Sequence, residues 1–244
     1  MEQAVRTQPR LASVRRSVAV LAGTLAAGIT LTQCSATPPP SAAVPSPTSA
    51  PAAGPPTAPA GGNVRPVTAA ELGASWRPGC PVDPARLRRV EVDHIGFDGQ
   101  NHRGELIVHQ DLVPEVIAIF AQLYRLGFPI EKIRPADRYP AADDEPSMQD
   151  NNTSAFNCRG IPGSEHWSQH AYGRAIDLNP RLNPCVYADG TFQPHNSAEY
   201  LDRGRSDPGL LHDGDRAVRV FTDRGWRWGG DWTSPVDYQH FERP

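Results

Sequence analysis

The stretch that decides the fold runs from Ser168 to Asp177 and reads SQHAYGRAID. It carries an imidazole at His170 and a carboxylate at Asp177, with Gly173 between them. Seven residues rise about 10 Å along a helix and more along a strand, whereas bonds to one metal ion are only about 2 Å long. If both side chains are ligands, the chain must reverse, and glycine makes a turn least costly. We therefore predict a turn at Tyr172-Gly173 and a strand over residues 175–178 that presents Asp177 to a metal.

A second stretch near the end of the chain, Asp237-Tyr238-Gln239-His240, offers what the first lacks. A catalytic zinc commonly has three protein ligands and keeps a fourth position for water, so His240 would complete the ligand set. A turn between Asp237 and His240 would bring the Asp237 carboxylate beside that water, whereas a flat strand would send it to the opposite face. A carboxylate there can accept a proton during attack on a carbonyl group. The two stretches together predict a peptide or amide hydrolase.

The alternative is that these residues have no metal-binding role and are ordinary surface or turn residues, as a histidine and an aspartate near a glycine usually are. Three further histidines have no comparable partner pattern and are interpreted as loop residues. Four tryptophans near the motifs are typical of a core or groove wall, although several beside a site would suit a glycan or peptide. These residues are His166, His195 and His212, and Trp167, Trp226, Trp228 and Trp232.

Hydrophobic periodicity outside the motifs predicts both strands and helices. Apolar residues alternate over Leu87–Ile95 and, after a turn signal, over residues 104–108, which favours a hairpin. The clearest helix covers residues 111–126, with Asp111 as its cap and Gly127 as its end. We also expect a short helix over residues 69–75 capped by Thr68, a strand over 130–133, a helix over 216–223, and long loops over 143–152 and 179–214. The polar loop 143–152 either rims a site or is a solvated insertion.

The first quarter of the chain has the features of an export segment. Arginines precede an uncharged apolar run over residues 18–31, which is too short for a membrane span. Cys34 follows in LTQC, which resembles the lipobox of bacterial lipoproteins except that Gln33 replaces the usual small residue. The next segment is rich in Ala, Pro, Ser and Thr and should be a flexible spacer. We predict an export signal over 1–34, a linker over 35–65 and one folded domain over 66–244.

The composition argues against nucleic acid as a partner. The formal net charge is −3, the pI is about 6.2, and the arginines do not form one block. Contact with a membrane is expected only through a lipid on Cys34, and a monomer is expected.

Three spaced motifs resemble the M15 family of zinc peptidases, in particular the group of D-alanyl-D-alanine carboxypeptidases and L-alanyl-D-glutamate endopeptidases that cut peptidoglycan stem peptides. They are SxHxxGxAxD at residues 168–177, GWxWGGxW at 225–232 and DxxHF at 237–241. The likeness runs from about Cys80 to the end of the chain. It implies an α+β fold, a single mixed helix and antiparallel-sheet domain of the type shared with the hedgehog signalling domain.

The resemblance also implies the roles of site residues. The ligands of one zinc ion fall on His170, Asp177 and His240, and the general base falls on Asp237. The carboxypeptidases of the family usually carry Glu at the position of the base, so Asp237 indicates the endopeptidase branch.

Two further features carried over from the family leave alternatives open. An arginine upstream of the histidine motif polarises the scissile carbonyl in the family, but the usual Gly-Tyr-Arg-Ser strand is absent here. Arg159 is the first candidate and Arg138 the second. Similar sequences carry Gly-Cys-Pro-Val and Phe-Asn-Cys-Arg, which favours a disulfide between Cys80 and Cys158 in an exported protein. Pairing of Cys158 with Cys185 is the alternative.

The predicted function is zinc-dependent hydrolysis of peptidoglycan peptides by a protein exported to the cell envelope or beyond it. Within the enzyme class, the alternative is a D-alanyl-D-alanine carboxypeptidase. Outside it, the alternative is a cell-wall-binding zinc protein without activity, because a zinc site can persist on a fold that no longer performs catalysis.

Overall fold

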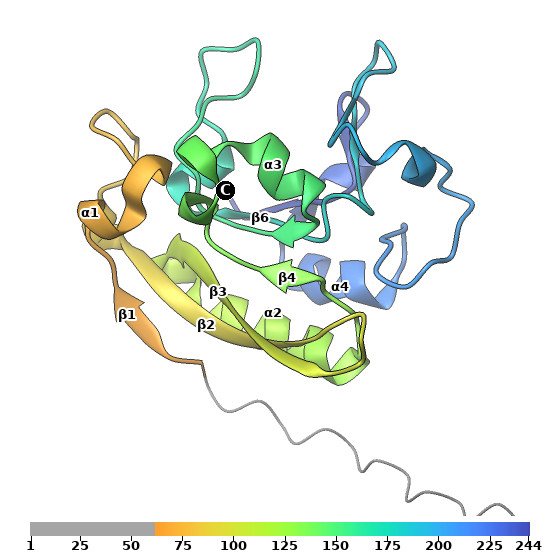
Figure 1. Cartoon of the computed structure of the whole chain (residues 1–244), viewed down its shortest axis with the longest axis horizontal. Helices are drawn as coiled ribbons and strands as arrows, with labels where there is room; N and C mark the ends of the chain where they lie inside the picture. The colour runs from red at the N-terminus through yellow and green to blue at the C-terminus, as the bar shows by residue number, and fades with distance from the viewer. Residues whose placement is uncertain (1–61) are drawn as a thin grey trace, which may run out of the picture. The chain divides into compact units, whose positions relative to one another are not determined.

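The first part of the folded chain is an antiparallel sheet backed by a long helix (Figure 1). The structure is a computed structural model that describes residues 62–244. The expected export signal, Cys34 and most of the linker lie outside the described residues. Strands β1 (Val64–Pro66), β2 (Leu87–Ile95) and β3 (Asn101–His109) pair in that order. The predicted hairpin is confirmed, with β3 starting three residues earlier than the alternation indicated.

Helix α1 (Ala69–Leu72) lies between the first two strands and continues as a 3-10 turn through Ser75. The Thr68 hydroxyl accepts a hydrogen bond from the Glu71 N–H at 3.3 Å, and the Glu71 carboxylate accepts one from the Thr68 N–H at 2.8 Å. This reciprocal capping box satisfies two backbone donors at the start of the helix. The predicted cap is therefore confirmed.

Helix α2 (Val113–Leu126) covers one face of the sheet and ends, as predicted, at Gly127 in the left-handed conformation. The prediction that Asp111 caps it was wrong, because a 3-10 turn over residues 110–112 precedes the helix and its cap residue, Leu112, makes no side-chain bond. The Val113 N–H donates to the Gln110 carbonyl, and Pro114 has no N–H. Few donors are therefore left for a side-chain cap.

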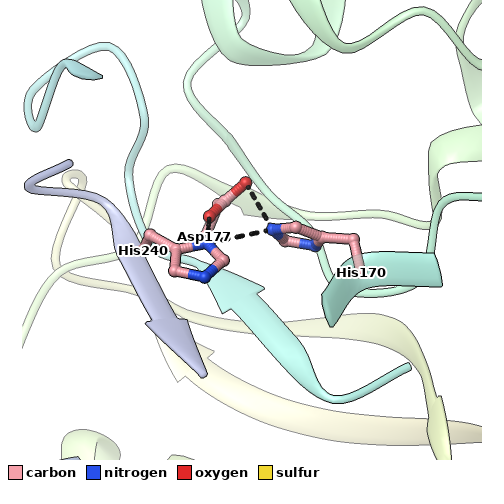
Figure 2. A group of neighbouring side chains, drawn as sticks. All are labelled: His170, Asp177 and His240. Atoms are coloured by element: carbon pink, nitrogen blue, oxygen red, sulfur yellow. Dashed lines mark hydrogen bonds and ion pairs between the residues drawn. The ribbon is translucent and has the colours of Figure 1, made fainter. Parts of the chain in front are cut away.

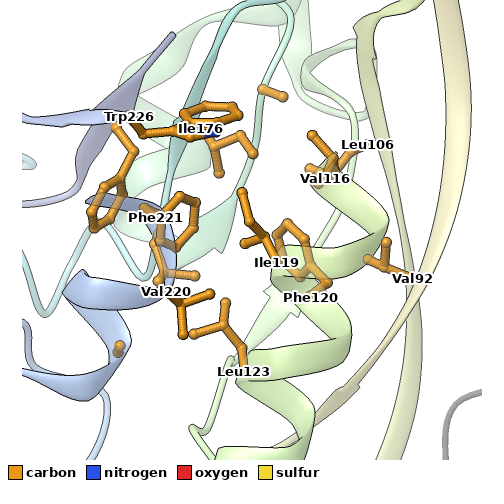
Figure 3. Close-up of a cluster of buried hydrophobic side chains, with 14 of the residues drawn as sticks. Val92, Leu106, Val116, Ile119, Phe120, Leu123, Ile176, Val220, Phe221 and Trp226 are labelled. Carbon is orange, nitrogen blue, oxygen red and sulfur yellow. The ribbon is translucent and has the colours of Figure 1, made fainter. Parts of the chain in front are cut away.

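A second antiparallel sheet carries the predicted motifs. It has the order β6 (Ala175–Asp177), β11 (His240–Glu242) and β9 (Arg227–Trp228), and α4 (Arg216–Thr222) packs beside it. The main hydrophobic core lies between this layer and α2 (Figure 3). Phe221 of α4 stacks on Phe241 of β11 with ring centroids 3.9 Å apart. This packing fixes β11, and with it the position of His240.

Shorter elements complete the mixed fold. Strand β4 (Lys132–Ile133) runs parallel to β5 (Asn152–Thr153), and β10 (Val236–Asp237), β7 (Cys185–Val186) and β8 (Phe192–Gln193) form a small sheet. The strand expected over 130–133 is thus only two residues long, and the region 179–214 contains two strands instead of an uninterrupted loop. No helix among residues 62–244 is long and apolar enough to cross a membrane. The fold is α+β.

The polar segment 143–152 is not the loop that we predicted. It contains helix α3 (Asp144–Gln149), whose N-cap Asp143 accepts a hydrogen bond from the Glu145 N–H at 3.2 Å. A six-residue helix is too short to show apolar periodicity, so only its capping chemistry marks it in the sequence. Because Asp143, Asp144 and Glu145 line a cavity of about 860 Å³, the segment does rim a site.

Candidate functional site

His170 lies on a 3-10 turn that the local sequence specifies. The Ser168 hydroxyl accepts a hydrogen bond from the His170 N–H at 3.3 Å, and the turn over residues 169–172 ends at Gly173, whose φ is +67°. A Cβ on Gly173 would lie 2.7 Å from the backbone nitrogen of His109, so both the conformation and the space require glycine. The chain reverses here and enters β6, which confirms the predicted turn.

The reversal and the pairing of β6 with β11 bring three side chains together (Figure 2). Asp177 and His240 are direct partners in the ladder. The Nε2 atom of His170 lies 3.1 Å from Oδ2 of Asp177, and Nδ1 of His240 lies 3.0 Å from Oδ1 of Asp177. The same two ring nitrogens are 3.2 Å apart. All three residues are buried, and one ligand atom from each lies within 4.8 Å of the others, so the group could hold a metal ion.

The outer nitrogens of both rings have acceptors of their own. Nδ1 of His170 contacts the carbonyl oxygen of Ala155, and Nε2 of His240 lies 3.5 Å from a carboxylate oxygen of Glu242. With the ring protons donated outward, the lone pairs of the other two nitrogens face Asp177. Metal-binding histidines are held in this way. The residues present therefore fit a metal ion.

The charges in this group also favour a cation. Burial would raise the pKa of Asp177, but the two imidazoles lower it far below its ordinary range. Burial would lower the pKa of His240, yet hydrogen bonds to Asp177 and Glu242 raise it to about 10. Without a metal, the buried carboxylates thus draw a proton onto His240. A metal ion would supply the same positive charge, as the chemistry of two imidazoles and one carboxylate permits.

Two members of the group, Asp177 and His240, form part of the wall of a cavity of about 860 Å³. Asp237 lines it as well, because the turn at Tyr238-Gln239 between β10 and β11 places Asp237 beside His240 and not on the opposite face. Its buried Oδ1 atom has no hydrogen-bond partner among the described residues. Burial and the charge of Asp177 raise the pKa of Asp237. An unbonded carboxylate oxygen at this place could accept a proton.

Only one of the two candidate arginines lies at the cavity. Arg159 lines it and forms an ion pair with Asp144 of α3. Burial lowers its pKa, but the nearby carboxylates, chiefly Asp144, raise it by more, so Arg159 is charged. The Arg138 side chain is 60% exposed and lines a separate cavity. The structure therefore brings Arg159, and not Arg138, to the candidate site.

The disulfide between Cys80 and Cys158 joins the segment before β2 to the segment that carries Arg159. The Arg77 guanidinium donates a 2.6 Å hydrogen bond to the Cys158 carbonyl. Cys185 has no disulfide partner within residues 62–244 and is a buried thiol at the cavity wall. The segment from Ala155 to Arg159 supplies both an acceptor for His170 and the candidate arginine, and the disulfide fixes it.

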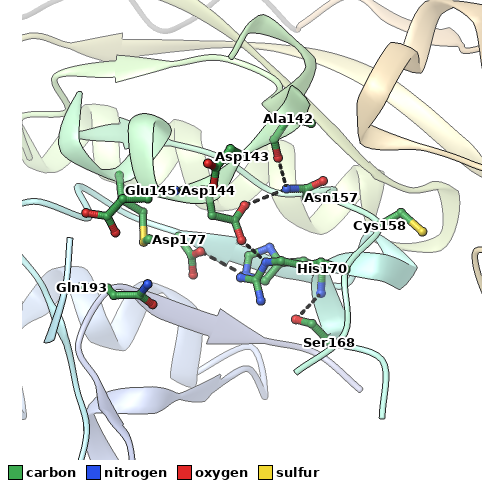
Figure 4. Close-up of polar contacts among 12 residues, drawn as sticks. Ala142, Asp143, Asp144, Glu145, Asn157, Cys158, Ser168, His170, Asp177 and Gln193 are labelled. Carbon is green, nitrogen blue, oxygen red and sulfur yellow. Dashed lines mark hydrogen bonds and ion pairs between the residues drawn. The ribbon is translucent and has the colours of Figure 1, made fainter. Parts of the chain in front are cut away.

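Several site residues were not found from the sequence. The Asp144 carboxylate accepts a 2.7 Å hydrogen bond from Asn157, which also donates to the Ala142 carbonyl at 2.8 Å (Figure 4). Tyr187 lines the cavity, and burial, with the nearby Cys185, raises its pKa to about 12. The ring of Trp232 lies 5.2 Å from that of His240. Only the cap at Asp143 could have pointed to α3, and nothing local marks Tyr187.

The fold and the site together define an α+β domain with a buried His-Asp-His group that could hold a metal ion beside a cavity of about 860 Å³. Residues 162–243 match the family model described as D-alanyl-D-alanine carboxypeptidase, so this part of the chain is similar to the M15 peptidases. The matched segment contains all three candidate ligands and Asp237. No curated protein and no solved structure gives a significant match.

Proposed function

We propose that the chain is a zinc-dependent peptidase that hydrolyses peptide bonds in peptidoglycan stem peptides, as an endopeptidase. The observation that carries the proposal is the convergence of His170, Asp177 and His240 on one point, with Asp177, His240 and Asp237 in the wall of a cavity of about 860 Å³. The family match supports peptidase activity in general.

Zinc held by the three ligands would supply Lewis acidity, which polarises a carbonyl group and makes water more acidic. Asp237 would accept the proton of the attacking water and return it to the amine of the leaving group. Arg159 would donate hydrogen bonds to the carbonyl oxygen as negative charge develops there. The ion pair with Asp144, which Asn157 supports in turn, would keep the guanidinium in that position.

The charges of the cavity support an endopeptidase over a carboxypeptidase. A carboxypeptidase must bind the terminal carboxylate of its substrate, for which a free cation is the natural partner. The cavity wall contains six carboxylates and two arginines. Arg159 is paired with Asp144, and Arg77 donates to the Cys158 carbonyl and lies over the Trp167 ring. The cavity wall is thus mainly acidic and its Arg159 is already paired, which disfavours binding of a terminal carboxylate and favours an internal peptide bond.

The disulfide supports a place outside the cytoplasm. Disulfides form and persist in oxidising compartments, and Cys80–Cys158 is well inside the folded domain. The first 34 residues also favour export, because arginines there precede a short uncharged apolar run, as in signal segments. We therefore propose that the protein acts in the cell envelope or beyond it, where its peptidoglycan substrate is.

The experiment is digestion of purified peptidoglycan by the zinc-loaded protein, followed by mass analysis of the released fragments. The expected result is fragments with a new amino end inside the stem peptide. Asp237→Asn is the matched control, because it should retain the metal and release nothing. Release of free D-alanine would instead make the protein a carboxypeptidase, which is the activity that the matched model's description names. Metal binding and peptidoglycan binding without any release would identify a silent binding protein.

A further inference from the structure

The small sheet of β10, β7 and β8 turns one face to the cavity of the candidate metal site. In its ladders, Asp237 lies opposite Cys185, and Cys185 lies opposite Gln193. Residues that are direct partners in a sheet carry their side chains on the same face, and all three of these residues line the cavity. The candidate base therefore stands at one end of a cross-strand row and Gln193 at the other, with the short side chain of Cys185 between them.

Tyr187 holds the amide at the far end of this row. It is two residues after Cys185, so its side chain points to the same face, and its N–H donates to the Thr191 carbonyl at 2.9 Å. The Tyr187 hydroxyl donates a 3.0 Å hydrogen bond to Oε1 of Gln193. Burial raises the pKa of Tyr187 to about 12, so the hydroxyl keeps its proton at neutral pH. The other end of the amide, Nε2 of Gln193, has two donors and no hydrogen-bond partner within residues 62–244.

The end of β8 is also anchored to α3. The backbone N–H and Nδ1 of His195 lie 2.7 Å and 2.6 Å from the same carboxylate oxygen of Glu145. The Asn196 side chain donates to the Gln149 carbonyl at 3.0 Å. Glu145 and Gln193 both line the cavity (Figure 4). Gln193 therefore has a defined place in the cavity wall and does not stand at the end of an unsupported hairpin.

The length of the row determines which part of a substrate Gln193 can contact. Neighbouring strands lie about 4.8 Å apart, so the two ends of the row, separated by two strand spacings, are about 10 Å apart. An extended peptide rises about 3.3 Å per residue, so this distance corresponds to about three residues. A peptide that lies along the row and is cleaved beside Asp237 thus meets Gln193 about three residues from the cleaved bond.

On the basis of the function proposed above, we propose that Gln193 binds the substrate chain, and that its Nε2 donates a hydrogen bond to a peptide carbonyl about three residues from the cleaved bond. Tyr187 is a positioning residue, because its hydroxyl occupies Oε1 and leaves Nε2 for the substrate. A donor so far from the reacting bond contributes only when the peptide is long enough to reach it. Gln193 therefore makes the enzyme select longer peptides over shorter ones.

The test compares peptides of different lengths on the zinc-loaded full chain. Fragments of the stem peptide are extended by up to about four residues on either side of the cleaved bond, so that the longest reach past the row. In each series, kcat/KM gives the preference for the longest peptide over the shortest. The same peptides are titrated by calorimetry into Asp237→Asn, with and without the change at Gln193. Binding is thus measured even if the parent cleaves none of them, which separates failure of the proposed function from failure of the Gln193 assignment.

Gln193→Leu keeps the size of the side chain but removes the amide. It should reduce the preference for long peptides about fivefold to tenfold in one of the two series, the usual effect of one lost hydrogen bond, and should weaken binding in parallel. Tyr187→Phe should reduce the preference less, because the donor remains but is no longer held. In the double variant the loss should be no larger than in Gln193→Leu alone, because Tyr187 acts through Gln193.

Gln100→Leu is the matched control, because it makes the same change at an exposed residue in the turn between β2 and β3 and should leave the preference unchanged. An unchanged preference and affinity in Gln193→Leu, or an equal loss in both series, would overturn the role of Gln193. Additive losses in the double variant would overturn the role of Tyr187.

Discussion

The cavity at the candidate metal site and the separate cavity at Arg138 each contain buried histidine, but they surround it in opposite ways. In the first, the outer nitrogens of His170 and His240 have acceptors, and the inner nitrogens meet the carboxylate of Asp177. In the second, neither ring nitrogen of His94 has a hydrogen-bond partner among the described residues. A ring whose one proton is held outward offers a lone pair to a cation.

Two short paired strands, β4 and β5, connect the walls of the two cavities. Strand β4 lines the second cavity, and its partner β5 continues directly to Ser154, whose backbone pairs with that of Asp177. One residue further on, the Ala155 carbonyl contacts His170. The pair of short strands thus separates an acid-rich cavity from a base-rich one. Matched substitutions in the two cavities should therefore have clearly different effects.

The largest effect is expected from loss of a metal ligand. Replacing His170 with alanine should reduce bound zinc from about one ion per chain to less than about a tenth, because two ligands cannot hold the ion against dialysis. His94→Ala should leave the zinc content unchanged, although it also removes a buried imidazole. Metal analysis of the dialysed proteins measures both. Equal zinc in the two variants would contradict the assignment of His170 as a ligand.

The next largest effect should separate the two arginines. Arg159→Gln should lower kcat about 10²–10³-fold, the usual loss when one donor to a developing oxyanion is removed. Arg138→Gln should change kcat by less than about twofold, because its side chain is exposed and remote from the metal ligands. Steady-state rates on isolated stem peptides measure this, with zinc content as the control for both proteins. If Arg138→Gln is the slower enzyme, the carbonyl-polarising role belongs there.

The candidate metal site could be predicted from the sequence more fully than the residues that surround it. The spacing of His170 and Asp177 allowed only a reversal, and Gly173 was the one place to make it, so the turn could be predicted from local chemistry. The long apolar periodicity of α2 was equally clear. In contrast, α3 has six residues and β4 has two, which is too short for any period to emerge.

Contacts between distant segments explain the remaining errors. Arg159 and Arg138 looked alike in the sequence, and only the fold places one at each cavity. The second cavity depends on β3 meeting β4, which no local pattern encodes. The false cap at Asp111 has a related cause, since the 3-10 turn before α2 satisfies the backbone without it.

A smaller effect is expected from the carboxylate behind His240. Glu242→Gln should weaken zinc binding about 10–100-fold, the usual effect of removing a group that orients a ligand, because an amide accepts the ring proton less strongly than a carboxylate does. Competition with a chelator of known affinity measures the change. Glu131→Gln is the matched control, because this exposed side chain lines the other cavity and should leave the affinity unchanged.

The smallest effect concerns His94 and the pH dependence of stability. Its folded-state pKa of about 4 is below the ordinary 6.5, so between these values the unfolded chain binds a proton that the folded chain does not. The contribution is fully present above about pH 6.5 and is lost as the pH falls towards 4. One pKa unit corresponds to about 1.4 kcal/mol, so the loss between pH 7.5 and pH 5 should be about 2 kcal/mol.

His94→Leu should remove this part of the pH dependence, because leucine does not titrate. Other groups, including the histidines of the metal centre, titrate in both proteins, so the quantity to measure is the difference between their unfolding free energies. Urea denaturation of the zinc-loaded proteins gives that difference at pH 7.5 and at pH 5. The variant should gain about 2 kcal/mol relative to the parent on acidification. A difference that does not change with pH would mean that His94 is protonated in the fold, with an acceptor that the unpartnered ring described above does not have.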